Sequence, residues 1–111
     1  MEASMYLPVV EKCRLYIDEH IYEPLYVHEI ANAFHVSVSY LSHMYKKETG
    51  ESISDYIRRR KMEEAKQLLR YTTFPVTCIY EMLSYCSQSY FSDIFRKETG
   101  MTPCLFRNSN G

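Results

Sequence analysis

Histidines, cysteines and paired carboxylates are the side chains best suited to metal binding or catalysis, and their spacing here argues against both. The histidines recur every seven or eight residues, at His20, His28, His35 and His43. Two zinc ligands on one helix are instead four residues apart. The neighbouring Glu63 and Glu64 diverge on a helix, and no glycine-rich phosphate loop or nucleophile elbow occurs. We therefore predict no catalytic residue, no metal and no cofactor, which argues against an enzyme.

Four cysteines, at positions 13, 78, 86 and 104, also lack a chemical motif. None of them forms a Cys-x-x-Cys pair, the spacing typical of zinc and redox sites. Two disulfides are arithmetically possible, but the opening Met1-Glu2-Ala3-Ser4 lacks the basic start of a secretion signal. We therefore expect reduced thiols that act as small core hydrophobes, and the cytoplasm as the default compartment.

The 111 residues, of which 46% are apolar and 24% charged, suit one small domain with its own core. No apolar run approaches the roughly 18 residues of a membrane helix. The net charge of -1 is unevenly distributed, because residues 1–57 carry nine acids and four bases while residues 58–70 carry six bases and two acids. A near-neutral total lowers the expected non-specific affinity for nucleic acid, but it does not exclude one positive face.

A self-match at an offset of 50 residues is the most informative feature of the sequence. The segment SVSYLS at 37–42 reappears as SQSYFS at 87–92, and YKKETG at 45–50 reappears as FRKETG at 95–100. Both parts match in order at one offset, so chance is a poor explanation. Because only two copies exist, the match indicates a duplicated unit and not a solenoid.

Each copy predicts a helix with its own boundaries. Ser37 or Ser87 can cap the start of the helix, and Gly50 or Gly100 closes its end. The side chains at helical spacing that we expect to face inward are Tyr40, Leu41, Met44 and Tyr45 in the first copy, and Tyr90, Phe91, Ile94 and Phe95 in the second. The pattern leaves open whether the leading tyrosine of each set belongs to the core.

A shorter helix precedes each of these helices, across a connection of three or four residues. Its apolar stripe consists of Val27, Ile30, Ala31 and Phe34 before the first copy, and of Val76, Ile79, Tyr80 and Leu83 before the second. A helix, a tight turn and a second helix make a helix-turn-helix, in which the second helix enters the major groove of DNA.

Three further helices complete an all-α fold of seven helices, in which a long linker helix joins the two helix-turn-helix units. The linker covers about 54–70, a first helix covers 8–21, and a last short turn follows Thr102-Pro103. The buried side of the linker is expected to carry Ile53, Tyr56, Ile57, Ala65, Leu68 and Leu69. Within a domain of 9–107, the two helix-turn-helix units are expected at about 28–49 and 76–99.

With these segments the sequence resembles the DNA-binding domain of the AraC/XylS family of bacterial transcription regulators. The resemblance runs from about Val9 to Arg107, and its strongest segments are LYVHEIA at 25–31 and residues 37–50. Further matches downstream are Tyr56-Ile57, Lys61-Met62, Ala65, Leu68-Leu69, Ser89-Tyr90-Phe91, Gly100 with Thr102-Pro103, and Phe106-Arg107. It is similar to the carboxy-terminal domains of response-regulator-type and sugar-type activators. The resemblance implies promoter or operator double-stranded DNA as the ligand, RNA polymerase as a partner, and no membrane.

Family relatives usually carry an additional sensor, dimerisation or phosphorylation-receiving domain. Only about eight residues precede the first expected helix. We therefore expect this chain to be a fragment of a longer regulator, with a compact stand-alone member as the alternative.

Four positions depart from the family pattern, three of them in the second unit. Tyr80 replaces the usual Ala, and Asp93 replaces a basic residue late in the second recognition helix. Ser84 replaces the Gly of the turn, and serine adopts φ > 0 only at some cost. Lys61 stands where Arg is usual, which is a milder change. These departures weaken the DNA contact expected of the second unit and leave the first nearly intact.

The alignment with the family assigns base-facing positions to both recognition helices. They are Ser39, Ser42 and His43, with Val38 at the entry, in the first helix, and Gln88, Ser89, Ser92 and Asp93 in the second. Serine hydrogen-bonds any base, His43 can donate to guanine, and Gln88 can pair with adenine. Asp93 can accept from cytosine, but phosphates repel it. The first unit is therefore expected to be the main base reader and the second an auxiliary clamp.

The candidate contacts to the DNA backbone are Lys46, Lys47, Arg96 and Lys97, together with the helix starts at Ser37 and Ser87. Residues 58–61, RRRK, point in different directions on a helix, which favours a solvated face paired with Glu63 and Glu64 over a DNA clamp. A helical protein-interaction module with weakened DNA affinity is the alternative function, because the second unit carries Asp93. An RNA or single-strand binder is disfavoured, since most aromatic residues fall on buried stripes.

Overall fold

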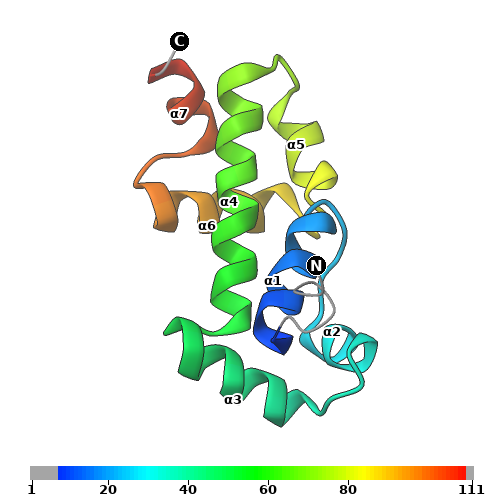
Figure 1. Cartoon of the computed structure of the whole chain (residues 1–111). Helices are drawn as coiled ribbons and strands as arrows, with labels where there is room; N and C mark the ends of the chain where they lie inside the picture. Colours follow the sequence, from blue (N-terminus) through cyan, green and yellow to red (C-terminus); the bar gives the residue numbers. More distant parts are fainter. Residues whose placement is uncertain (1–7, 110–111) are drawn as a thin grey trace. The chain divides into compact units, whose positions relative to one another are not determined.

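The computed structural model describes residues 8–109, and these residues form seven α-helices and no strand (Figure 1). The helices are α1 (Val9–Glu19), α2 (Val27–Ala33), α3 (Val38–Thr49), α4 (Ile53–Tyr71), α5 (Val76–Met82), α6 (Gln88–Thr99) and α7 (Pro103–Ser109). The prediction of an all-α fold with seven helices is confirmed. The backbone groups into two units: unit 1 holds residues 8–21 and 25–57, and unit 2 holds residues 22–24 and 58–109.

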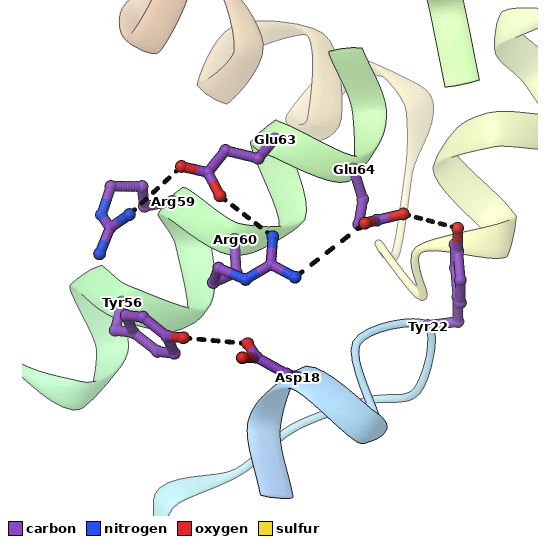
Figure 2. A network of polar contacts seen from close by, with 7 residues as sticks. All are labelled: Asp18, Tyr22, Tyr56, Arg59, Arg60, Glu63 and Glu64. Carbon is purple, nitrogen blue, oxygen red and sulfur yellow. Dashed lines mark hydrogen bonds and ion pairs between the residues drawn. The ribbon is translucent and has the colours of Figure 1, made fainter. Parts of the chain in front are cut away.

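The core of unit 1 is built from α1, α2, α3 and the first turns of α4. Its buried side chains are Val10, Cys13, Ile17, Ile21, Ile30, Ala31, Leu41, Tyr45, Ile53 and Tyr56. The hydroxyl of Tyr56 donates a 2.9 Å hydrogen bond to the carboxylate of Asp18 and so joins α4 to α1 (Figure 2). The guanidinium carbon of Arg14 lies 5.7 Å from the centre of the Tyr56 ring.

The core of unit 2 is built from the rest of α4 together with α5, α6 and α7. Its buried side chains are Met62, Ala65, Leu68, Leu69, Ile79, Leu83, Phe91, Phe95 and Phe106. Phe95 and Phe106 meet edge to face with ring centroids 5.4 Å apart. The guanidinium of Arg107 donates to the carbonyl oxygens of Leu69 and Thr72 at 3.0 and 3.2 Å, which gives partners to acceptors at and just after the end of α4.

The boundaries of the two copies match in detail. The side-chain oxygen of Ser37 accepts a hydrogen bond from the backbone N–H of Tyr40 at 3.0 Å, and Ser87 accepts from Tyr90 at 3.1 Å. Gly50 and Gly100 end α3 and α6 with φ of 85° and 82°, in the left-handed conformation that glycine adopts without strain. Both predictions are confirmed.

The duplication also continues past these glycines. The side-chain oxygen of Ser52 accepts from the N–H of Asp55 at the start of α4, and that of Thr102 accepts from the N–H of Leu105 at the start of α7. Helix α4 begins at Ile53 and helix α7 begins at Pro103, so these two starts are also 50 residues apart. The repeated unit therefore includes the first turn of the helix that follows the recognition helix.

The turns inside the two helix-turn-helix units differ by one residue. Helix α2 and helix α5 lie 49 residues apart, whereas α3 and α6 lie 50 apart, so the second turn contains one additional residue. The residue with positive φ is His35 at 58° in the first turn and Ser84 at 62° in the second. In both turns the next N–H reaches back to the preceding helix, from Val36 to Ala31 and from Tyr85 to Tyr80. Ser84 thus adopts the positive φ predicted for it.

The cysteines only partly follow the prediction. All four thiols are free, but Cys13 alone is buried, while Cys78, Cys86 and Cys104 are exposed. Their predicted role as core hydrophobes is therefore wrong for three of the four. The reason is that each of the three lies beside, and not on, the apolar stripe of its own segment.

Candidate nucleic-acid interface

The outer side of α3 carries the side chains predicted to face DNA in unit 1. Leu41 and Tyr45 are fully buried. Ser39, Ser42 and His43 are exposed on the other side of the helix. Val38 is 43% exposed at the helix entry. The structure therefore places all of these predicted positions on the accessible surface of one helix.

The outer side of α6 has the same layout in unit 2. Phe91 and Phe95 are fully buried in the core that α6 forms with α4, α5 and α7. Gln88, Ser89 and Asp93 are exposed, whereas Ser92 is half-buried. The two outer sides differ in charge, because Asp93 occupies the position that His43 has in α3. An aspartate at this position is unfavourable beside phosphates.

Tyr40 and Tyr90 lie outside the core, and this settles the alternative that the sequence left open. Their side chains are 50% and 53% exposed. The residue after each tyrosine, Leu41 or Phe91, is fully buried. The helical turn therefore directs the tyrosine to the rim of the buried stripe, and the prediction that it faces inward is wrong. Neither tyrosine was among the site residues predicted from the sequence.

Basic side chains stand at the far end of each recognition helix. Lys46 and Lys47 are exposed in the last turn of α3, and Arg96 and Lys97 are exposed in the last turn of α6. Neither α3 nor α6 has an acidic residue in its first turn. The positive ends of both helix dipoles therefore have no neighbouring carboxylate within the first turn. Ser37 and Ser87 are fixed there as caps of their own helices.

The basic run at 58–61 divides its contacts among several partners, and Figure 2 shows those of Arg59 and Arg60. Arg59 and Arg60 reach the carboxylate of Glu63 at 3.2 and 3.0 Å. Arg58 lies 3.2 Å from Glu98, near the end of α6. Arg60 also lies 4.0 Å from the carboxylate of Glu64. The predicted pairing with Glu63 and Glu64 is therefore confirmed for the two middle arginines. Arg58 instead pairs with the last turn of the recognition helix of unit 2.

Lys61 is the exception in this run, because it is only 6% exposed. Its Nζ donates to the carbonyl oxygen of Leu83 at 2.6 Å and to that of Glu23 at 3.0 Å. Burial lowers the pKa of Lys61 from 10.5 to about 8. Sequence reasoning missed this position, because the carbonyls that receive it are 22 and 38 residues away along the chain.

Segment 22–24 is held in unit 2 beside Lys61. The hydroxyl of Ser84 donates to the carbonyl oxygen of Tyr22 at 2.6 Å, and the hydroxyl of Tyr22 donates to Glu64 at 2.7 Å (Figure 2). Burial and this hydrogen bond raise the pKa of Tyr22 to about 12. Ser84 and Leu83 belong to the turn of the second helix-turn-helix, so Lys61 and this segment both fix that turn.

Within residues 8–109, no cluster of three or more His, Cys, Asp or Glu side chains is arranged to hold a metal ion. Among the same residues, no helix is both long and apolar enough to cross a bilayer. In each unit a turn joins two helices, and the second helix has an accessible polar outer side. Two such units define a helix-turn-helix DNA-binding domain.

Comparison with known proteins gives the family. A model of a helix-turn-helix domain matches residues 30–109. YobQ, an uncharacterised HTH-type transcriptional regulator of Bacillus subtilis (strain 168), is 37% identical over 94 residues, which are 85% of this chain and 39% of YobQ. The regulatory protein SoxS of Escherichia coli (strain K12) is 35% identical over 100 residues, which are 90% of this chain and 94% of SoxS.

Solved structures agree with these relatives. The C-terminal domain of AraT, a response regulator from Geobacillus stearothermophilus, superposes with a TM-score of 0.89 at 36% identity, covering 93% of this chain and 86% of that chain. A transcriptional regulator of the AraC-type DNA-binding class from Chromobacterium violaceum has a TM-score of 0.85 at 25% identity, over 100% of this chain and 97% of that chain. The chain belongs to the AraC-type helix-turn-helix family of DNA-binding transcription regulators. It spans nearly all of SoxS but well under half of YobQ.

Proposed function

We propose that residues 9–107 form a domain that binds double-stranded DNA in a sequence-specific manner and so regulates transcription in a bacterium. The first helix-turn-helix, at about 28–49, is the main base reader, and the second, at about 76–99, is auxiliary. The observation that carries this proposal is that α3 and α6 have matching accessible outer sides. The outer side of α6 alone bears a carboxylate, that of Asp93, and this ranks the second unit below the first.

The residues assigned to base reading are Ser39, Ser42 and His43 in α3, and Gln88, Ser92 and Asp93 in α6. His43 is the side chain of the first set that can discriminate between bases, because it can donate a hydrogen bond to guanine. Serine can form a hydrogen bond with any base and so discriminates weakly. The half-buried position of Ser92 leaves Gln88 and Asp93 as the more accessible readers of the second set. Weaker base reading by unit 2 follows from the charge of Asp93.

The residues assigned to the DNA backbone are Lys46, Lys47, Arg96 and Lys97, with the helix starts at Ser37 and Ser87. Phosphate contacts fix the register of a protein on the duplex and carry no sequence information. Each charged contact releases counterions, so several such contacts make the affinity steeply dependent on salt.

The wider role follows from the family and from the lengths of the relatives. YobQ is more than twice as long as the matched segment, so we propose an additional sensor, dimerisation or phosphorylation-receiving domain in the full regulator. RNA polymerase is the proposed partner at the promoter, and the place of action is the bacterial cytoplasm, where the chromosome lies. We propose no enzymatic activity, because the relatives described above are named as regulators.

A salt-dependent binding experiment tests this function. A labelled pool of short random duplexes is titrated with the chain at about 50 and 200 mM salt, and binding is followed by fluorescence anisotropy. Binding that weakens steeply with salt, together with one enriched sequence after selection, supports the proposal. Absence of binding at the lower salt would favour the protein-interaction module, and binding without an enriched sequence would exclude specific recognition.

A further inference from the structure

A tyrosine occupies the same exposed position in both recognition helices, and its side chain takes no part in the buried core or in the helix caps. Tyr40 and Tyr90 are the third residues of α3 and α6, and only their backbone N–H groups take part in the caps. About half of each ring is accessible, at 50% and 53%. Leaving a large aromatic ring half in water at two equivalent positions gains little for folding.

Comparison of α3 with α6 separates the positions that changed after duplication from those that did not. The buried or half-buried pairs that differ are Leu41/Phe91, Met44/Ile94 and Tyr45/Phe95. The exposed pairs that differ are Val38/Gln88, His43/Asp93 and Lys46/Arg96, and the last of these keeps its positive charge. On the outer side, the pairs that are identical are Ser39/Ser89, Tyr40/Tyr90 and Ser42/Ser92. The core was repacked in one copy relative to the other, yet the exposed tyrosine is the same in both.

Side chains that are identical in two readers suit the parts of DNA that are identical in every sequence. Those parts are the phosphates and the sugars, whereas base edges vary. A phenol hydroxyl donates a hydrogen bond to a phosphate oxygen, and its ring can lie against the apolar edge of a deoxyribose. Among the residues assigned to base reading, the pair that differs, His43/Asp93, can then distinguish the bases that the two helices meet, whereas the serines of the identical pairs can bond to any base.

We propose that the hydroxyls of Tyr40 and Tyr90 each donate to a phosphate oxygen of the DNA backbone, which makes these tyrosines positioning residues for the two recognition helices. The proposal rests on the proposed function, because it requires that the chain binds duplex DNA. It adds to each helix an uncharged backbone contact in the first turn, distinct from the lysines and arginine of the last turn.

The structure fixes the backbone of both tyrosines, and in unit 2 also the ring, before any contact with DNA. In each helix the serine cap fixes the backbone of the tyrosine. In unit 2 the Tyr90 ring also packs against Tyr85, with centroids 6.0 Å apart, and Tyr85 in turn packs against buried Phe91 at 5.4 Å. Tyr85 lies in the longer second turn, so this turn supports the ring of Tyr90.

The test removes only the hydroxyl. In the full chain, Tyr40→Phe and Tyr90→Phe are compared with Tyr71→Phe, a matched control at a tyrosine that is 71% exposed at the end of α4. We expect each of the first two variants to bind about three- to tenfold more weakly to selected and random duplexes alike, as for the loss of one hydrogen bond. Their enriched sequences and salt dependence stay unchanged, because no charge is lost. Lys47→Ala, in contrast, should reduce the slope of log affinity against log salt by about one.

Each other outcome overturns the proposal in a distinguishable way. If both phenylalanine variants bind like the wild type, the hydroxyls make no contact. If Tyr40→Leu loses affinity while Tyr40→Phe does not, the ring stacks and does not donate. A changed base preference in Tyr40→Phe would make Tyr40 a base reader. If the wild-type chain itself binds no duplex, the proposed function fails, and this inference fails with it.

Discussion

The ammonium group of Lys61 lies 2.6 Å from the carbonyl oxygen of Leu83, the residue that ends α5. A lysine in a run of four basic residues therefore serves as the C-terminal partner of a helix in the second helix-turn-helix. Its charge is favourable at the negative end of the helix dipole. The same ammonium group holds the carbonyl of Glu23 at 3.0 Å, so one buried cation satisfies two backbone acceptors in unit 2.

Replacement of Lys61 by an apolar residue of similar length should destabilise the protein. Lys61→Met leaves the carbonyls of Leu83 and Glu23 without this donor, and we expect the free energy of unfolding to fall by about 1–3 kcal/mol. Urea denaturation followed by circular dichroism measures the change. Lys12→Met, at an exposed lysine of α1, is the control and should change stability by less than about 0.5 kcal/mol. Equal stability of the two variants would mean that water replaces the buried ammonium group at no cost.

Glycine substitutions should have different effects in the two turns. His35 and Ser84 both have positive φ, so His35→Gly should stabilise the protein by up to about 1 kcal/mol. Ser84→Gly relieves the same strain but removes the 2.6 Å hydrogen bond to the carbonyl of Tyr22, so we expect little or no gain. Thermal and urea unfolding of the two variants would check this. A larger gain for Ser84→Gly would show that the Ser84 hydroxyl contributes nothing to stability.

The difference between the two readers has a mutational test. The double variant Ser42→Ala, His43→Ala should reduce binding to the selected duplex by about tenfold or more while random duplexes bind nearly as before. A fall of equal size on selected and random duplexes would assign these side chains to the backbone. The measurement is anisotropy with both kinds of duplex at one salt concentration.

The second unit should respond in the opposite direction. Asp93→Lys removes a negative charge from the outer side of α6 and adds a positive one, so we expect tighter binding and a slope of log affinity against log salt that is steeper by about one. Glu19→Lys, at an exposed acid of α1 that belongs to neither recognition helix, makes the same change of net charge. Equal gains in the two variants would mean that only net charge matters, and unit 2 would then have no close contact with DNA.

The buried thiol of Cys13 predicts a loss of stability at alkaline pH. Burial raises the pKa of Cys13 from 9.0 to about 11. Between these values the unfolded chain loses the thiol proton while the native protein keeps it, so the native state binds more protons and the free energy of unfolding falls as pH rises. The contribution reaches about 2–3 kcal/mol above pH 11, at about 1.4 kcal/mol for each pH unit between the two pKa values.

A variant without the thiol isolates this contribution from those of the other groups. Lys61 acts in the opposite direction between pH 8 and 10.5, because its native pKa is lowered. The contribution of Lys61 remains in Cys13→Ala, so it cancels when the two proteins are compared. The stability difference between wild type and variant should therefore shrink as pH rises from about 9 to 11. Urea titrations across this range provide the measurement. A difference that stays constant with pH would show that the thiol ionises equally in both states.

The sequence by itself determined the local elements and their boundaries. Helical spacing of apolar residues, the serine caps and the closing glycines predicted seven helices, and the starts and ends of α3 and α6 agree with the structure within one residue. These features depend on contacts within about four residues along the chain, which a sequence displays directly. The family resemblance, which the repeat and the segments around it carry, also assigned the outer sides of both recognition helices.

Only the tertiary structure decided which side chains at the edge of a stripe are buried. Tyr40 and Tyr90 lie outside the core, whereas Lys61, in the most basic segment, lies inside it. Three cysteines expected in the core are exposed. Burial at such positions depends on which distant segment covers them, and Lys61 meets carbonyls 22 and 38 residues away. The sequence pattern gives the direction of a side chain on its own helix, but it does not contain the neighbour that covers it.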